Sequence, residues 1–194
     1  MDQVGIESIL LGQCGYRYAG YGFAGRLRFP RPIYTPLKML RICQRENISF
    51  QQDNISLSKK GVVRGLHYQV NPNLQSKLVT CRKGSIFDVA IDLRKNSNTF
   101  GKYVSTYLNE NNKNQLWIPS KFAHGFISLE NNTEVQYKVQ GFRDISCERS
   151  IKWNDPDLAI DWPILKNKIN DVIISNKDSN APSFKDFIKS GDYF

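Results

Sequence analysis

His67 and His124 are the only two histidines in this chain of 194 residues. Imidazole takes up and releases protons near neutral pH, so each is a candidate general base or acid. His67 lies in the segment RGLHYQ, where strand alternation would put Arg64 and His67 on opposite faces. Tyr137 could serve as a general acid inside a barrel, next to a cation. For an isolated histidine or tyrosine, however, a structural role in the core is the commoner case.

Lys77 opens the segment KLVTC and could point into a barrel, although a solvated lysine at a strand end is more usual. Two inward-facing histidines could also bind a metal ion. A catalytic metal site normally needs a longer ligand set, such as two closely spaced histidines plus a carboxylate, and the spacing here does not provide one. The four cysteines form no CxxC motif, and scattered thiols are typical of the reducing cytoplasm. We therefore expect a cytoplasmic protein without a metal.

Short β-strands must position these residues, because the sequence from residue 46 onward alternates polar and apolar side chains between turn-forming residues. No amphipathic helix separates the strands, which favours an all-β sandwich or small barrel with inward-pointing side chains around a cavity. A short helix is expected near residues 184–189. The predicted strands lie at residues 62–69, 77–81, 86–93, 103–108, 115–118, 125–129 and 134–139.

Residues 1–45 differ in composition from the rest of the chain. They contain seven positively and two negatively charged side chains but no asparagine, whereas the remainder is rich in asparagine and lysine. Recurrent glycines and prolines oppose long regular elements. The segment could be a divergent arm, a poorly ordered tail, or residues foreign to the ancestral protein, for example from an altered reading frame. A targeting peptide fits less well because serine is scarce. We therefore expect an atypical segment at 1–45 and one domain at 46–194.

The net charge of +9 favours an anionic partner, such as nucleic acid, a membrane surface or a phosphorylated metabolite. The basic residues after residue 45 are spread along the chain, and no known nucleic-acid-binding signature is present. No stretch approaches the roughly 20 apolar residues that span a membrane, and residues 1–12 lack the pattern of a secretory signal. We expect neither a nucleic-acid partner nor a membrane partner.

Taken together, the segments of the chain resemble the dTDP-4-dehydrorhamnose 3,5-epimerase family. The resemblance runs in order and at the family's spacing from about residue 48 to 182, and it implies a cupin-type jelly roll that forms a homodimer and uses no metal or other cofactor. The matching segments are FQQDNISLSKKGVVRGLHYQ (50–69), QSKLVTCRKGSIFDVAIDLRKNSNTFGKY (75–103), QLWIPSKFAHGFISL (115–129), EVQYK (134–138), IKWNDPDLAIDWP (151–163) and SNKDSNAP (175–182).

The resemblance implies an isomerase that inverts dTDP-4-dehydro-6-deoxy-D-glucose at carbons 3 and 5. The product, dTDP-4-dehydro-L-rhamnose, leads to dTDP-L-rhamnose for surface polysaccharide such as lipopolysaccharide. Both carbons flank the ketone at carbon 4, which acidifies their protons. Removing a proton gives an enolate, and returning it to the opposite face inverts the centre. This chemistry needs a base, an acid on the other face and a positive charge near the enolate oxygen.

Residue by residue, the resemblance assigns His67 as the base and Tyr137 as the acid. Asp178 matches the aspartate that orients the base, and Lys77 matches the lysine near the developing oxyanion. A carboxylate on the far imidazole nitrogen selects the tautomer and stabilises the imidazolium. Further substrate-binding matches are Gln52, Asp53, Asn54, Arg64, His124, Glu148 and Lys177.

Two features depart from the family. The family's GDxRGFFxE segment has no counterpart near the start of the chain. Of the two aromatic residues that follow the tyrosine, Phe142 retains one and Arg143 replaces the other. Two alternatives therefore stay open beside the 3,5-epimerase. One is an epimerase that acts at a single carbon or on a related 4-keto sugar nucleotide. The other is a non-catalytic protein that binds sugar nucleotides.

Overall fold

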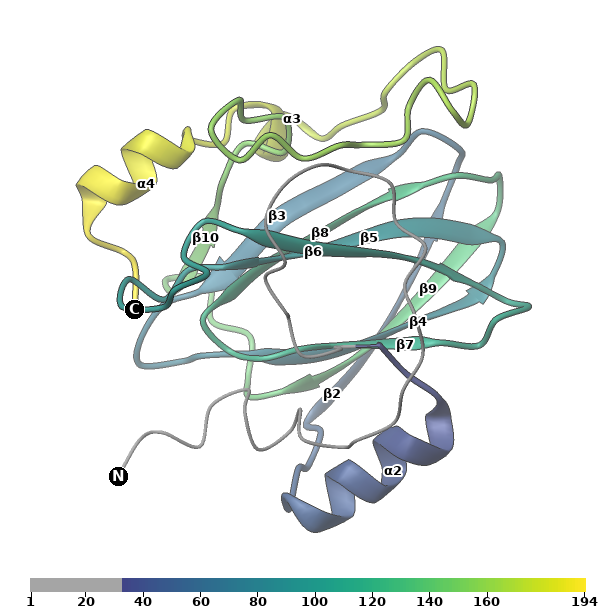
Figure 1. Ribbon diagram of the computed structural model, residues 1–194, viewed down its shortest axis with the longest axis horizontal. Coiled ribbons are helices and arrows are strands. Elements are labelled where there is room, and N and C mark those ends of the chain that lie inside the picture. The colour runs from purple at the N-terminus through teal and green to yellow at the C-terminus, as the bar shows by residue number, and fades with distance from the viewer. Residues whose placement is uncertain (1–32) are drawn as a thin grey trace.

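The computed structural model describes residues 33–194, which form two antiparallel β-sheets of five strands each (Figure 1). The first sheet has the order β1 (Ile33–Tyr34), β7 (Gln115–Ile118), β4 (Ser76–Lys83), β9 (Thr133–Gln140) and β2 (Gln52–Ser58). The second has the order β10 (Glu148–Ser150), β3 (Val63–Gln69), β8 (Phe122–Ser128), β5 (Ser85–Asp92) and β6 (Tyr103–Asn109).

A shared apolar core lies between the two sheets. Val79 of β4 and Val135 of β9 meet Ile86 of β5 and Phe126 of β8 there, and all four are buried. Alternate residues of each strand point into this layer, as the polar–apolar alternation predicts. The all-β jelly roll of cupin type is confirmed, as is every strand predicted from alternation. The short strands β1 and β10, and the edge strand β2, were not predicted individually.

The C-terminal residues cover the outer face of the second sheet (Figure 1). Helix α4 (Phe184–Ser190) begins with a capping box between Ser183 and Asp186, and it buries Phe184 and Phe187 against the core residues of that sheet. This element confirms the short helix expected near residues 184–189. The shorter helix α3 (Asn176–Ser179) lies beside β3, and it carries a predicted site residue.

Helix α2 (Pro36–Arg45) covers part of the outer face of the first sheet, opposite the C-terminal layer (Figure 1). The buried side chain of Met39 packs with Leu78 and Trp117. The glycines and prolines of residues 1–45 oppose long regular elements, and α2 is a helix of 10 residues in which Pro36 sits at the start, where its missing N–H costs no hydrogen bond. The helix lies before residue 46, and the predicted boundary at residue 45 stays a prediction. Within residues 33–194, no helix is long and apolar enough to cross a membrane.

Candidate active site

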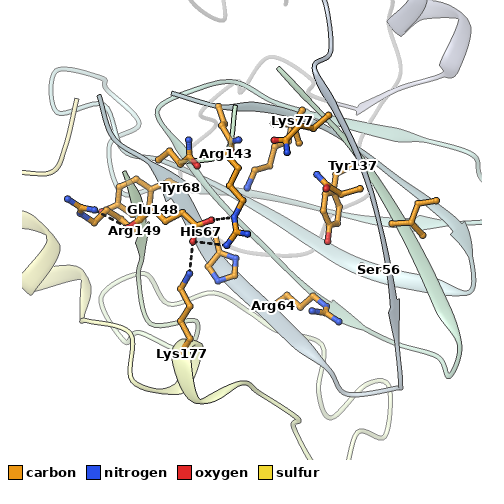
Figure 2. Close-up of a pocket in the computed structure, with 16 residues that line it drawn as sticks. Ser56, Arg64, His67, Tyr68, Lys77, Tyr137, Arg143, Glu148, Arg149 and Lys177 are labelled. Carbon is orange, nitrogen blue, oxygen red and sulfur yellow. Dashed lines mark hydrogen bonds and ion pairs between the residues drawn. The ribbon is translucent and has the colours of Figure 1, made fainter. Parts of the chain in front are cut away.

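A cavity of about 560 Å³ opens between the two sheets. Its walls come from β2, β4 and β9 on one side and from β3 and β10 on the other, with α3 at the mouth (Figure 2). Eight of the eleven site residues predicted from the sequence line it: Gln52, Asn54, Arg64, His67, Lys77, Tyr137, Glu148 and Lys177.

The side chain of Asp178 forms a hydrogen bond with the imidazole of His67. Asp178 Oδ1 lies 2.6 Å from His67 Nε2, and its Oδ2 accepts a hydrogen bond from the backbone N–H of Gly65 at 3.3 Å. Burial alone would raise the pKa of the Asp178 carboxyl, but the bonds from His67, Gly65 and Ser175 hold this pKa below its usual value. Asp178 is therefore an anion that orients His67, whose ring is still 38% exposed to the cavity.

Tyr137 lies on the opposite wall from His67. It belongs to β9 of the first sheet, whereas His67 belongs to β3 of the second, and both side chains line the same cavity (Figure 2). The two groups can therefore reach a ligand from opposite sides. This is the arrangement that proton removal from one face and return to the other requires.

Lys77 supplies a cation close to Tyr137. It lies on β4, which pairs with β9 so that Lys77 is opposite Val139, and its side chain is half-buried in the cavity wall. Burial lowers the pKa of the Lys77 ammonium to about 8, although the nearby carboxylates of Glu148 and Asp88 act in the opposite direction. The group is thus charged at neutral pH, in a position where a cation is poorly solvated.

His124 is not on the cavity wall. It is the neighbour of His67 across the β3–β8 pair, and its ring is buried against Asp88, with Nε2 2.6 Å from Asp88 Oδ1. Burial lowers the pKa of His124 in spite of the Asp88 carboxylate, and this keeps the ring neutral near pH 7. His124 is only 7% exposed and is not among the residues that line the cavity, and its predicted contact with the sugar stays a prediction.

Asp53 points away from the cavity. Successive residues of a strand face opposite sides, so Gln52 and Asn54 line the cavity while Asp53 lies on the outer face of the first sheet. There it accepts hydrogen bonds from Lys138 at 2.7 Å and Gln136 at 2.8 Å. The structure therefore does not bring Asp53 together with the other predicted site residues of the chain.

Two arginines that line the cavity, Arg143 and Arg149, had no site role predicted from the sequence. Arg143 follows β9 in a loop, where alternation gives no information about direction, and Arg149 lies on the three-residue strand β10. The charged side chains that line the cavity are therefore five cations and one carboxylate. They are Arg64, Lys77, Arg143, Arg149, Lys177 and Glu148. The cavity is thus strongly attractive to an anion.

Among residues 33–194, no three His, Cys, Asp or Glu side chains form a group that could hold a metal ion. The expectation that the protein uses no cofactor stays a prediction.

The fold and the cavity define a jelly-roll protein with a cation-rich cavity, in which a histidine and a tyrosine lie on opposite walls. The sequence matches the family model described as dTDP-4-dehydrorhamnose 3,5-epimerase over residues 37–186, which is most of the chain. The chain belongs to this family, and it is an isomerase by class.

Similar proteins are sugar-nucleotide epimerases by name. An enzyme named dTDP-4-dehydrorhamnose 3,5-epimerase from Shigella flexneri is 48% identical over 147 residues, covering 76% of this chain and 76% of the relative. A solved 3,5-epimerase from Legionella pneumophila, in complex with dTDP-4-keto-L-rhamnose, has a TM-score of 0.70 at 42% identity, with coverage of 75% of this chain and 76% of that one. A 3′-monoepimerase from Streptomyces bikiniensis, in complex with dTDP-quinovose, has a TM-score of 0.72 at 26% identity, with coverage of 79% and 77%.

Proposed function

We propose that the protein converts dTDP-4-dehydro-6-deoxy-D-glucose into dTDP-4-dehydro-L-rhamnose by inverting carbons 3 and 5. This is a step toward dTDP-L-rhamnose for surface polysaccharide. Membership of the epimerase family supports the reaction, and the complex of the Legionella relative with a dTDP-4-keto sugar supports the class of ligand. The free thiols of Cys43, Cys81 and Cys147 support a reducing compartment, and we place the reaction in the cytoplasm.

The observation that carries this proposal is the pair of His67 and Tyr137 on opposite walls of one cavity. His67 removes the proton from the carbon next to the ketone, and its imidazolium is stabilised by the Asp178 carboxylate. Tyr137 returns a proton from the other side. The ammonium of Lys77 stabilises the enolate oxygen between these two steps, because negative charge develops there.

The ligand's diphosphate suits the excess of cations around the cavity. Arg64 and Lys177 were predicted as binding residues, and both line it. A guanidinium binds phosphate through charge-assisted hydrogen bonds, which are stronger than neutral ones. Gln52 and Asn54 add neutral polar groups from the edge strand β2 that can bind hydroxyl groups of the sugar.

We also propose that the protein works as a homodimer. Within residues 33–194, β2 pairs only with β9, so its other edge is open, and Ile55 and Leu57 on it are 57% and 65% exposed. An open edge with exposed apolar side chains favours pairing with another chain. Because Gln52 and Asn54 of the same strand line the cavity, a partner placed along β2 would lie beside the site.

The proposal is tested by deuterium exchange. The dTDP-4-keto sugar is incubated with the protein in deuterated water, and NMR follows solvent deuterium at carbons 3 and 5. The wild-type protein is expected to label both carbons. Replacing His67 with alanine removes the general base, so His67→Ala is expected to slow both exchanges by about 10²–10⁴-fold, while binding of dTDP changes little.

Other outcomes would assign a different function. Labelling at one carbon alone would indicate a monoepimerase, as the Streptomyces relative is named. Binding of dTDP without any labelling would indicate a non-catalytic sugar-nucleotide-binding protein. Wild-type exchange rates in His67→Ala would refute the role of the histidine.

A further inference from the structure

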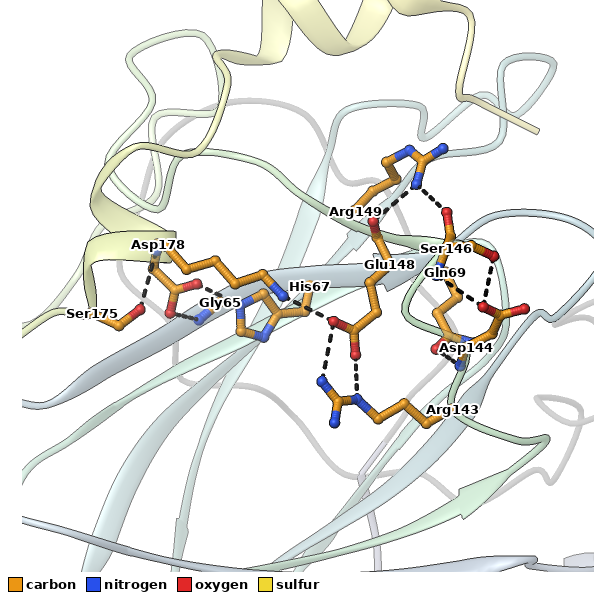
Figure 3. A network of polar contacts seen from close by, with 11 residues as sticks. Gly65, His67, Gln69, Arg143, Asp144, Ser146, Glu148, Arg149, Ser175 and Asp178 are labelled. Carbon is orange, nitrogen blue, oxygen red and sulfur yellow. Dashed lines mark hydrogen bonds and ion pairs between the residues drawn. The ribbon is translucent and has the colours of Figure 1, made fainter.

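Arg143 reaches from the loop after β9 back to the mouth of the cavity. Its Nε donates to Glu148 Oε1 at 2.5 Å, and its terminal nitrogen lies 3.4 Å from Glu148 Oε2 (Figure 3). The guanidinium end of the side chain points toward His67, as Figure 2 shows. With 59% of its side chain exposed, Arg143 is much more accessible than Glu148, at 20%.

Glu148 is shared by two cations. Its Oε2 also accepts a hydrogen bond from Lys177 at 2.9 Å, so a single carboxylate neutralises Arg143 and Lys177 together (Figure 2). The hydrogen bonds from Arg143, together with Lys177, lower the pKa of Glu148 to about 2 in spite of its partial burial, so it stays ionised at any working pH. If Arg143 turned away, Lys177 would still hold the carboxylate.

Arg143 can therefore change partner at low cost, while Lys177 keeps the Glu148 carboxylate paired. Exposed ion pairs contribute little to stability, because water solvates both charges when the pair separates. A guanidinium also offers parallel N–H groups that match two oxygens of a phosphate as well as they match a carboxylate. An anion that enters the cavity mouth competes with Glu148 for the Arg143 side chain.

The position of Arg143 indicates which part of a ligand it meets. A sugar that reacts with His67 and Tyr137 lies between the two walls, and the group attached to it extends toward the mouth, where Arg143 and Lys177 lie (Figure 2). In a nucleotide sugar this group is the diphosphate. We propose that Arg143 leaves Glu148 to bind a phosphate of the nucleotide, and so sets the affinity for diphosphorylated ligands. This inference rests on the proposed function for the identity of the ligand.

The test compares ligands with and without phosphate. Binding of dTDP is measured by isothermal titration calorimetry, and binding of thymidine by NMR titration, for wild type, Arg143→Gln and Arg143→Lys. We expect Arg143→Gln to weaken dTDP binding about tenfold or more, since a charge-assisted hydrogen bond is lost. Thymidine binding should stay within about twofold of wild type, and Arg143→Lys should be intermediate because it keeps the charge but not the paired donors. In turnover, KM should rise while kcat stays near wild type.

Arg82→Gln is the matched control. Arg82 forms an ion pair with Glu134 and does not line the cavity, so its loss removes the same charge elsewhere. The inference is overturned if Arg143→Gln binds dTDP like wild type, if Arg82→Gln weakens dTDP equally, or if thymidine and dTDP weaken together. The binding measurements with dTDP and thymidine do not need turnover. Absence of deuterium exchange in the wild type would therefore refute the proposed function. The titrations with dTDP and thymidine would still decide the role of Arg143.

Discussion

At the scale of single residues, the candidate site combines the Asp178 carboxylate, which is bonded to the His67 imidazole, with the poorly solvated ammonium of Lys77. Asp178 is ionised because the bonds to His67, Gly65 and Ser175 outweigh its burial. Lys77 shows the opposite balance, since its burial outweighs the attraction of Glu148 and Asp88 and lowers its pKa. A cation that is weakly solvated before the reaction interacts strongly with an oxyanion, because little water has to be displaced from it.

The pKa of Lys77 predicts how activity depends on pH. Below about 8 the ammonium is charged and can stabilise the enolate, and above this value it loses its proton. We expect kcat/KM for deuterium exchange to fall as the pH rises through about 8. In Lys77→Met, which has no charge at any pH, the rate should be lower by about 10²–10³-fold and should not fall in that range.

The measurement is an NMR exchange assay at several pH values between 6 and 10 for both proteins. Thermal unfolding at each pH serves as the control for loss of structure. A wild-type rate that stays level up to pH 10, or a rate in Lys77→Met that falls with the wild-type profile, would contradict this role of Lys77.

At the scale of elements, two facing glycines, Gly65 of β3 and Gly125 of β8, lie beside the His67–Asp178 pair. Gly65 has φ +118°, which disfavours any other residue, and a Cβ on it would lie 2.5 Å from the Cα of Gly125. The regular pairing of β3 with β8 is interrupted between Arg64 and His67 at this point. The interruption leaves the backbone N–H of Gly65 free to donate to Asp178 instead of to a strand.

Substituting this glycine should therefore damage the fold as well as the site. We expect Gly65→Ala to lower the free energy of unfolding by about 2 kcal/mol or more, because both the backbone angle and the contact with Gly125 are unfavourable. Urea unfolding followed by circular dichroism measures the change. Gly191→Ala is the matched control, since Gly191 also has a positive φ but no atom within 4 Å of its added Cβ. An equal loss of unfolding free energy in both variants would show that the close approach of β3 and β8 does not contribute to the effect of Gly65→Ala.

At the scale of the whole molecule, layers cover the two sheets unequally. The C-terminal residues cover the outer face of the second sheet, whereas on the first sheet α2 packs over Leu78 and Trp117. In the described part of the chain, the outward side chains of β2 remain exposed, including Ile55 and Leu57. This is the surface on which we expect the second subunit.

A charge placed on this strand should separate the subunits. We expect Leu57→Lys to shift a dimer toward monomer, because a lysine on an edge strand opposes pairing with another chain. Analytical ultracentrifugation at micromolar concentration measures the change in mass. The control is Leu165→Lys on a loop, where the leucine is 93% exposed. A monomeric wild type, or a Leu57→Lys variant that stays dimeric, would refute this interface.

The sequence by itself determined the strands, because alternation along a strand is a local property that decides which side chains share a face. It also supplied the segments that carry His67, Lys77 and Tyr137, and the resemblance of these segments to the epimerase family predicted the roles of the three residues. The resemblance grouped Asp53 with Gln52 and Asn54, although alternation along β2 puts Asp53 on the other face and its side chain points outward.

The tertiary structure decided the contacts between distant parts of the chain, which strand alternation cannot predict. The resemblance implied that Asp178 orients His67, and these residues, 111 positions apart, meet because α3 packs beside β3. His124 is buried against Asp88 because β8 and β5 pair within the second sheet, and Arg143 bonds Glu148 at the cavity mouth because the loop after β9 turns back toward β10. Such contacts depend on packing and loop direction, which no local pattern in the sequence encodes.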